Sequence, residues 1–117
     1  MAYERMEHIV PGRRRVAPPA VTIYPRGTVY LNAEAYRALG RPRYVAVYRA
    51  GTELAFHARS SAAGAFRVSA VGQGGALFTS TALGRLVGGR AKLPAEVRDS
   101  VVRARLSDGL AESTDMD

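Results

Sequence analysis

Gly27–Gly40, with the sequence GTVYLNAEAYRALG, decides the predicted fold, because a similar stretch, Gly75–Gly88, GALFTSTALGRLVG, follows 48 residues later. Each stretch predicts a short strand that leads into a short helix. Asn32 and Ser80 stand where the two helices begin, and side chains of these types can accept hydrogen bonds from free backbone N–H groups of a first turn. Each stretch ends in glycine, which readily takes the left-handed conformation that follows a helix. The repetition predicts two similar units in one chain, with chance similarity as the alternative.

Strand patterns flank both stretches. Alternating β-branched and aromatic residues predict two short strands before the first helix and a hairpin after it, in the order β-β-α-β-β. Residues 60–64 are a small-residue linker, and residues 88–92 are predicted to be a loop. The predicted strands are Val21–Tyr24, Thr28–Leu31, Tyr44–Tyr48, Glu53–Ala58, Phe66–Val71, Leu77–Thr79 and, as one or two strands, Ala95–Leu106; the predicted second helix is Thr81–Val87. We therefore expect a β-rich α+β fold, a small barrel of two pseudo-repeated β-β-α-β-β units.

The length of 117 residues suits one domain with a modest core. We predict a basic flexible arm at 1–20, a single domain at 21–106, with units at 21–59 and 65–106, and an acidic tail at 107–117. No apolar run is long enough to span a bilayer, and the charged N-terminus does not read as a secretory signal. With no cysteine in the chain, we expect a cytoplasmic protein with no membrane partner.

Positive charge is the most informative bulk property. The net charge is +7, but the last 11 residues hold four acids and no base, so the other 106 carry +11. Sixteen of the 17 bases are arginine, whose guanidinium binds phosphate bidentately and stacks on aromatic rings. This predicts a polyanionic partner, DNA or else RNA. The alternative is a compositional bias toward arginine combined with selection for solubility.

Seven arginines are the candidate nucleic-acid contacts. Three lie in the arm, where they could follow a nucleic-acid backbone. Four surround the first predicted helix, and two of these, Arg37 and Arg41, are spaced to share one helical face. Tyr24, Tyr44 and Tyr48 alternate with these bases, either as binding residues or as core and rim residues. The seven are Arg13, Arg14, Arg15, Arg26, Arg37, Arg41 and Arg43.

The sequence contains few residues of the types that usually act in catalysis. The histidines are His8, in the predicted arm, and His57, which the strand alternation turns toward solvent. The few acids of the predicted domain form no close pair suited to acid–base chemistry or metal binding. Gly72–Gly75 is followed by a strand and contains no lysine, so it predicts a turn with positive φ and not a phosphate loop. We expect no enzyme, no metal and no cofactor.

The first stretch resembles the AbrB/SpoVT/MazE swapped-hairpin DNA-binding domains. Its matching residues are Gly27, Val29, Leu31, Glu34, Leu39 and Gly40, with Arg37 at a basic helix position of that family. The resemblance implies interlocked hairpins in a shared barrel and a DNA-binding role, transcription-regulator-like or antitoxin-like and of bacterial type. It also implies pairing of two units, so we expect a homodimer or a pseudo-dimeric monomer.

The departures from the family pattern bear on DNA binding more than on the fold. Asn32 replaces a proline, Tyr36 stands where many members have arginine, and Pro42–Tyr44 replaces a Gly-Asp turn. Val21 and Thr22 occupy positions that are typically basic, and the second stretch matches less well. The alternative function is therefore a non-enzymatic protein-interaction or assembly module with a basic solubilising surface and a protein partner.

Overall fold

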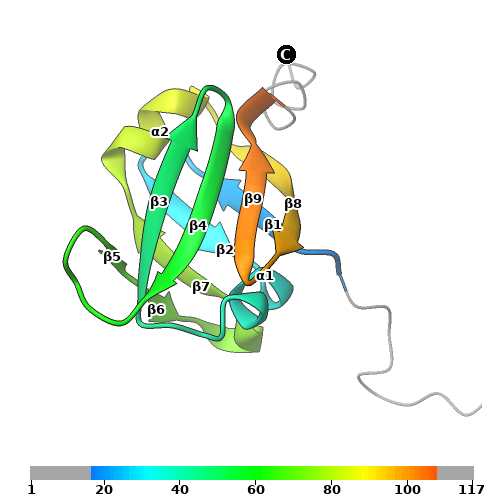
Figure 1. Cartoon of the computed structure of the whole chain (residues 1–117). Helices are drawn as coiled ribbons and strands as arrows, with labels where there is room; N and C mark the ends of the chain where they lie inside the picture. Colours follow the sequence, from blue (N-terminus) through cyan, green and yellow to red (C-terminus); the bar gives the residue numbers. More distant parts are fainter. Residues whose placement is uncertain (1–16, 108–117) are drawn as a thin grey trace, which may run out of the picture.

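The computed structural model describes residues 17–107, which form a β-rich domain with a nearly closed antiparallel sheet. Figure 1 shows the barrel-like sheet, with α1 and α2 at opposite ends of it. Within this range the elements are β1 (Ala20–Ile23), β2 (Thr28–Leu31), α1 (Ala33–Ala38), β3 (Tyr44–Ala50), β4 (Glu53–Arg59), β5 (Phe66–Arg67), β6 (Ser69–Ala70), the 3₁₀ turn η2 (Gly72–Gly74), β7 (Ala76–Thr79), α2 (Thr81–Val87), β8 (Ala91–Arg98) and β9 (Val101–Arg105).

The order of the strands explains how the sheet nearly closes. It runs β5-β3-β4-β9-β8-β1-β2-β7-β6, and the two outermost strands are separated in sequence only by Val68. The Val68 backbone N–H donates to the Arg43 carbonyl at 2.8 Å, while β5 pairs with β3 and β6 pairs with β7. The prediction of one strand over Phe66–Val71 is therefore wrong, because this segment changes partner at Val68.

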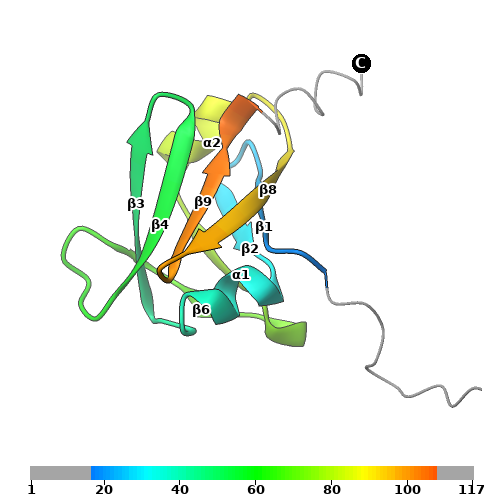
Figure 2. The ribbon, with the colours of Figure 1, turned by 45° about the vertical axis from the view of Figure 1, so that its right-hand side comes forward.

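The four strand pairs that are not hairpins each join a strand that precedes residues 60–64 to a strand that follows them. β1 pairs with β8, β2 with β7, β3 with β5 and β4 with β9, all antiparallel. Val29 lies opposite Phe78, and Phe56 lies opposite Val102. Figure 2 shows β8 and β9 between the β3–β4 hairpin and the β1–β2 hairpin.

The inward side chains of both halves fill one core. Val21, Ile23, Val29, Leu31 and Phe56 are fully buried, and burying such a side chain stabilises the fold by roughly 1.5–3 kcal/mol. Aromatic rings connect the halves, since Phe78 stacks on Phe66 at 5.0 Å and lies 6.4 Å from Phe56, centroid to centroid. Neither half has a separate core.

The predicted helix caps are confirmed. The Asn32 side chain accepts from the Ala35 N–H at 3.0 Å, and the Ser80 side chain accepts from the Leu83 N–H at 3.2 Å. Gly40 and Gly88, just after the helices, have φ of 85° and 65°. These left-handed residues end both helices and direct the chain into β3 and β8.

The second half is more extended than the sequence predicted. Residues 88–92 were expected to be a loop, but β8 begins at Ala91, which lies opposite Ile23 of β1. Pairing with β1 therefore extends the strand into the predicted loop. Asp99 and Ser100 have φ of 55° and 63°, and two successive positive φ values form the tight turn that suits a two-residue hairpin between β8 and β9.

Each of two turns packs against the start of a helix. The Ser80 N–H donates to the Gly27 carbonyl at 2.7 Å, so the β1–β2 turn lies against α2. The turn between β6 and β7 lies against α1 in a similar way, where a Cβ added at Gly74 would meet the Ala33 side chain at 3.2 Å. The prediction of a positive-φ turn at Gly72–Gly75 is confirmed by φ of 71° at Gln73 and 91° at Gly74.

Candidate nucleic-acid interface

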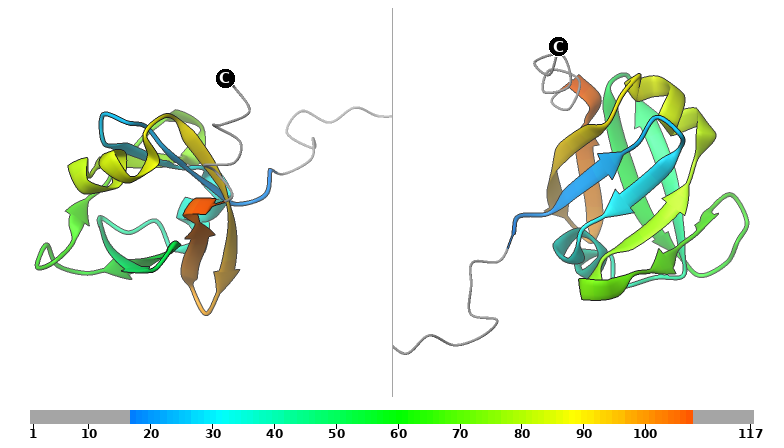
Figure 3. Two further views of the ribbon diagram at one scale, coloured as in Figure 1. Left: turned by 90° about the horizontal axis from the view of Figure 1, so that it is seen from above. Right: turned by 180° about the vertical axis from the view of Figure 1, so that it is seen from behind.

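Charged residues are segregated among the strands. Residues 17–107 contain 13 bases and four acids, a net charge of +9. β1, β2, β6 and β7 contain no charged residue at all, and we call them the uncharged sheet. All charges on described strands lie on β5, β3, β4, β9 and β8, the charged sheet. Figure 1 shows the charged sheet in front, and the right panel of Figure 3 shows the uncharged sheet from behind.

Strand register determines which charges share the outer face of the charged sheet. Because Val45, Phe56 and Val102 are buried inside the barrel, the residues next to them on each strand point outward. Cross-strand neighbours face the same side, and opposite charges at such positions attract. The outward residues with polar or aromatic side chains are Tyr44, Tyr48, Glu53, His57, Arg59, Arg67, Lys92, Glu96, Arg98, Arg103 and Arg105.

The two acids of this face are matched by arginines. Glu53 lies opposite Arg105, and Glu96 lies opposite Arg103. Arg59 instead lies opposite Tyr44. Arg98, Arg103 and Arg105 still outnumber Glu96 on the β8–β9 side, as Arg59 and Arg67 outnumber Glu53 on the β3–β4–β5 side, so both sides of the charged sheet are basic.

Aromatic rings accompany the arginines on the β3–β4–β5 side. Tyr44 lies between Arg59 and Arg67 in register, each on a neighbouring strand. Tyr48 is 47% exposed, and its ring meets His57 edge to face at 5.0 Å. The Arg59 guanidinium hydrogen-bonds to the Tyr48 hydroxyl, and its carbon lies 5.9 Å from the ring centroid. We call Tyr44, Tyr48, His57, Arg59 and Arg67 the aromatic patch.

The structure separates the predicted arginines. Arg37, Arg41 and Arg43 lie on α1 or in the connection that follows it, at one end of the barrel. Arg26 lies at the other end, because the adjacent Gly27 contacts the start of α2. Arg13–Arg15 lie outside the described residues. The four predicted arginines that the structure describes therefore do not form a single cluster.

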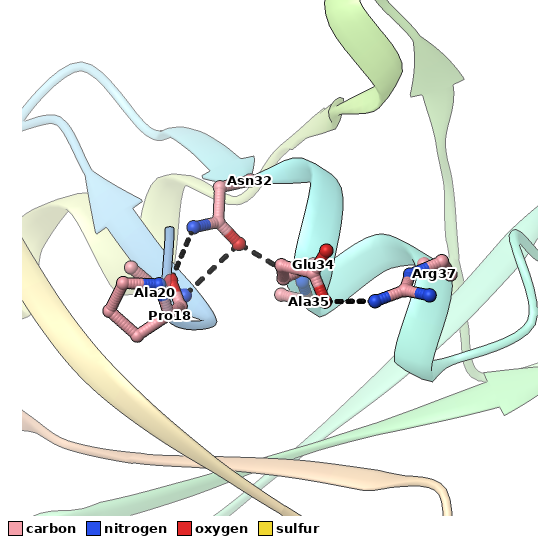
Figure 4. Close-up of polar contacts among 6 residues, drawn as sticks. All are labelled: Pro18, Ala20, Asn32, Glu34, Ala35 and Arg37. Carbon is pink, nitrogen blue, oxygen red and sulfur yellow. Dashed lines mark hydrogen bonds and ion pairs between the residues drawn. The ribbon is translucent and has the colours of Figure 1, made fainter. Parts of the chain in front are cut away.

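The predicted shared helical face of Arg37 and Arg41 is wrong. α1 ends at Ala38, and Arg41 has φ of 52°, so Arg41 lies in the left-handed turn beyond the helix. Arg37 is also paired with Glu34, one helical turn before it, as Figure 4 shows. A phosphate at Arg37 would have to compete with this carboxylate.

Figure 4 also shows what Asn32 does at the position where the resembled family has proline. Besides capping α1, its side-chain oxygen accepts from the Ala20 N–H at 3.1 Å, and its amide donates to the Pro18 carbonyl at 2.7 Å. These contacts fix the start of β1 against α1. A proline at this position could make neither side-chain contact.

Arg59, Arg67 and His57 were not among the contacts predicted from the sequence. The alternation along β4 would have placed Arg59 on the face of His57, but the neighbouring strand was needed to bring Arg67 beside Tyr44. His57 was predicted to face solvent; it is on the outer face but half-buried. Tyr36, by contrast, is buried and donates to the Pro42 carbonyl at 2.9 Å.

The hollow on the β8–β9 side is small, and residues 17–107 contain no cluster of metal-ligating side chains. This hollow is lined by Glu53, Pro94, Glu96, Arg103 and Arg105 among others, and its volume of about 230 Å³ is below the usual range for ligand pockets. In this part of the chain no three histidine, aspartate or glutamate residues are grouped to hold a metal ion. None of its helices is long and apolar enough to cross a bilayer.

Comparison of the chain with known protein families, curated proteins and solved structures found no match. The resemblance to AbrB-type domains therefore depends on the residues quoted above, and the candidate interface depends on its own geometry.

Proposed function

We propose that this chain is a non-enzymatic nucleic-acid-binding protein that binds DNA through the outer face of its charged sheet. The observation that supports this most directly is the distribution of charge: the uncharged sheet has none, and the described domain carries +9. Burial already explains the lack of charge on β1, β2 and β7, so the support comes from the concentration of exposed arginines on the outer face of the charged sheet. A basic face of this kind supplies the phosphate contacts of a nucleic-acid-binding protein.

The proposed architecture is a swapped-hairpin barrel of two pseudo-repeated units in one chain. The offset of 48 residues relates β2 to β7 and the start of α1 to the start of α2. Pairing of β2 with β7, and of β4 with β9, joins each strand to the one at the corresponding place in the other unit. These features support a role like that of AbrB-type transcription regulators or antitoxins, with the barrel complete in one molecule.

The proposed contacts combine the charged sheet with the end of the barrel next to it. Arg59 and Arg67 lie on the outer face, and Arg43 directly precedes β3. Arg41 is exposed in the turn before it. Arg26 and Arg37 are then secondary contacts at the ends of the barrel, and Arg13–Arg15 stay a prediction.

The test is binding of a labelled DNA duplex across a salt series, with the double variant Arg59→Gln/Arg67→Gln. Each lost phosphate contact lowers the slope of log K against log salt by about 0.9, so we expect the slope to fall by about 2. The matched control, Arg85→Gln/Arg90→Gln, removes the same charge from α2 and from the connection between α2 and β8 and should change the slope by less than about 0.5.

Equal losses in both double variants would show that only net charge matters and would refute the assigned face. Absence of binding to duplex, single-stranded DNA and RNA at 50 mM salt would refute the function itself and favour the protein-interaction module. The double variant Arg37→Ala/Arg41→Ala measures the α1 end separately.

A further inference from the structure

We propose that the aromatic patch is a stacking platform for unpaired bases, so that the charged sheet binds single-stranded DNA. This inference rests on the proposed function and adds the strandedness of the DNA. It follows from the exposed ring of Tyr48 and its arginine neighbours, whereas the proposed function follows from charge alone. The uncharged sheet provides an internal comparison, because it lacks the arginines that would hold the strand.

Tyr48 is the central element of the platform. It is the one large aromatic side chain of the described residues that is well exposed, at 47%. Arg59 donates to its hydroxyl group, so the guanidinium lies toward the hydroxyl end of the ring. His57 contacts it at an interplanar angle of 86°, and an edge contact of this kind covers at most one of the two ring faces. With Arg59 over the ring and His57 at its edge, Tyr48 is still 47% exposed, so part of the ring is accessible to a base.

Besides His57 and Arg59, the neighbours of Tyr48 on the outer face include two alanines. Ala46 precedes it by two positions on β3, and Ala55 lies directly opposite on β4. Arg103 on β9 is the next residue in the same row, beyond Ala55. A flat base can therefore approach the ring from the Ala55 side, and a guanidinium is available beyond the alanine.

Arginines also flank Tyr44, the second tyrosine of the aromatic patch on β3. Tyr44 and Tyr48 are four residues apart on β3, about 13 Å along the strand, and Tyr44 is flanked by Arg59 and Arg67. Surfaces that bind single-stranded nucleic acid combine aromatic rings, on which bases stack, with guanidinium groups, which bind phosphates. The positive charge of this side also complements the phosphate backbone.

An unpaired base is the partner that fits an exposed ring. In a duplex the faces of the bases are covered by their neighbours, so only an unpaired base can stack on Tyr48. The two helices lie at the ends of the barrel and not on this sheet (Figure 1). The outer face of the charged sheet therefore has no helix that could enter a major groove, but it has a tyrosine ring on which an unpaired base could stack.

The experiment measures binding of fluorescein-labelled oligothymidine, and of a duplex of equal length, by anisotropy at fixed salt. Tyr48→Leu should weaken single-strand binding about 5- to 150-fold, the effect of removing one base stack, and should leave duplex binding within about 2-fold. Tyr48→Phe keeps the ring and should stay within about 3-fold of the parent. Tyr24→Leu removes a tyrosine that also lies near an arginine, Arg90, at 5.8 Å, but outside the patch, and should have no effect.

The outcomes separate this inference from the proposed function. If Arg59→Gln/Arg67→Gln weakens binding but Tyr48→Leu does not, the platform is refuted and the basic interface stands. If the parent binds neither form of DNA, both fail. Equal losses from Tyr24→Leu and Tyr48→Leu, or tighter binding of oligouridine than of oligothymidine, would overturn the assignment of the patch to single-stranded DNA. Circular dichroism of each variant checks that the fold is retained.

Discussion

Gly84 provides a test of how closely the β1–β2 turn packs against α2. It lies inside α2, where alanine would favour the helix over glycine by about 1 kcal/mol. However, a Cβ at Gly84 would lie 2.7 Å from the Pro25 carbonyl oxygen and from the Gly27 nitrogen. Both are backbone atoms of the β1–β2 turn, so no side chain can move aside. We predict that Gly84→Ala destabilises the protein although alanine is the better helix former.

The magnitude follows from the overlap. Inserting a methyl group into a packed contact costs about 1–3 kcal/mol, and contact with rigid backbone on two sides favours the upper part of that range. After the gain in helix propensity, a net loss of about 1–2 kcal/mol remains. For a domain of this size that lowers Tm by roughly 4–16 °C.

The assay is thermal and urea unfolding followed by circular dichroism, with Gly89→Ala as the matched control. Gly89 lies two residues after α2, has no positive φ, and a Cβ added there would meet no atom within 4 Å. We expect the control to change stability by less than about 0.5 kcal/mol. A Gly84→Ala variant as stable as the parent, or more stable, would refute the close packing of the turn on α2.

Three further predictions concern the cap, the tail and the assembly state. Asn32→Ala removes three side-chain hydrogen bonds and should cost about 1–3 kcal/mol in urea unfolding, whereas Asn32→Asp, which keeps the cap acceptor, should cost less; equal costs would contradict this. Truncation after Ser107 removes four acids and raises the net charge from +7 to +11, so it should tighten DNA binding at low salt and have little effect near 1 M salt; unchanged low-salt affinity would exclude a moderating role of these acids. Sedimentation at low micromolar concentration should give a 12.6 kDa monomer, and an obligate dimer would contradict a barrel completed within one chain.

The sequence predicts the local elements well where a capped helix follows a strand. The bounds of β2 and α2 agree with the predicted Thr28–Leu31 and Thr81–Val87, because alternation, an N-cap and a terminal glycine all give the same answer there. Prediction fails where a partner strand decides. Ala91 joins β8 because Ile23 lies opposite it, and Val68 interrupts a strand because the segment on each side of it has a different partner.

The candidate site could be predicted only in part for the same reason. The sequence draws attention to arginines and tyrosines that are close in the chain, and those around α1 were selected on that basis. The aromatic patch instead joins residues through register: Tyr44 meets Arg59 and Arg67, 15 and 23 residues later. Helical spacing also gave a wrong prediction, a shared face for Arg37 and Arg41, because Arg41 lies in a left-handed turn beyond the last helical residue. Chemistry that depends on pairing across strands requires the pairing to be known.

The proposed two-unit architecture gives a reason for joining both units in one chain. At the offset of 48 residues, Tyr48 corresponds to Glu96, and His57 corresponds to Arg105. Two identical chains would present the same side chains twice around a symmetry axis. A single chain can keep the aromatic residues on the β3–β4 side and place other side chains at the corresponding positions of β8 and β9. Under this proposal the barrel has one binding surface with a defined direction, although β2 pairs with β7 and β4 pairs with β9 across the two proposed units.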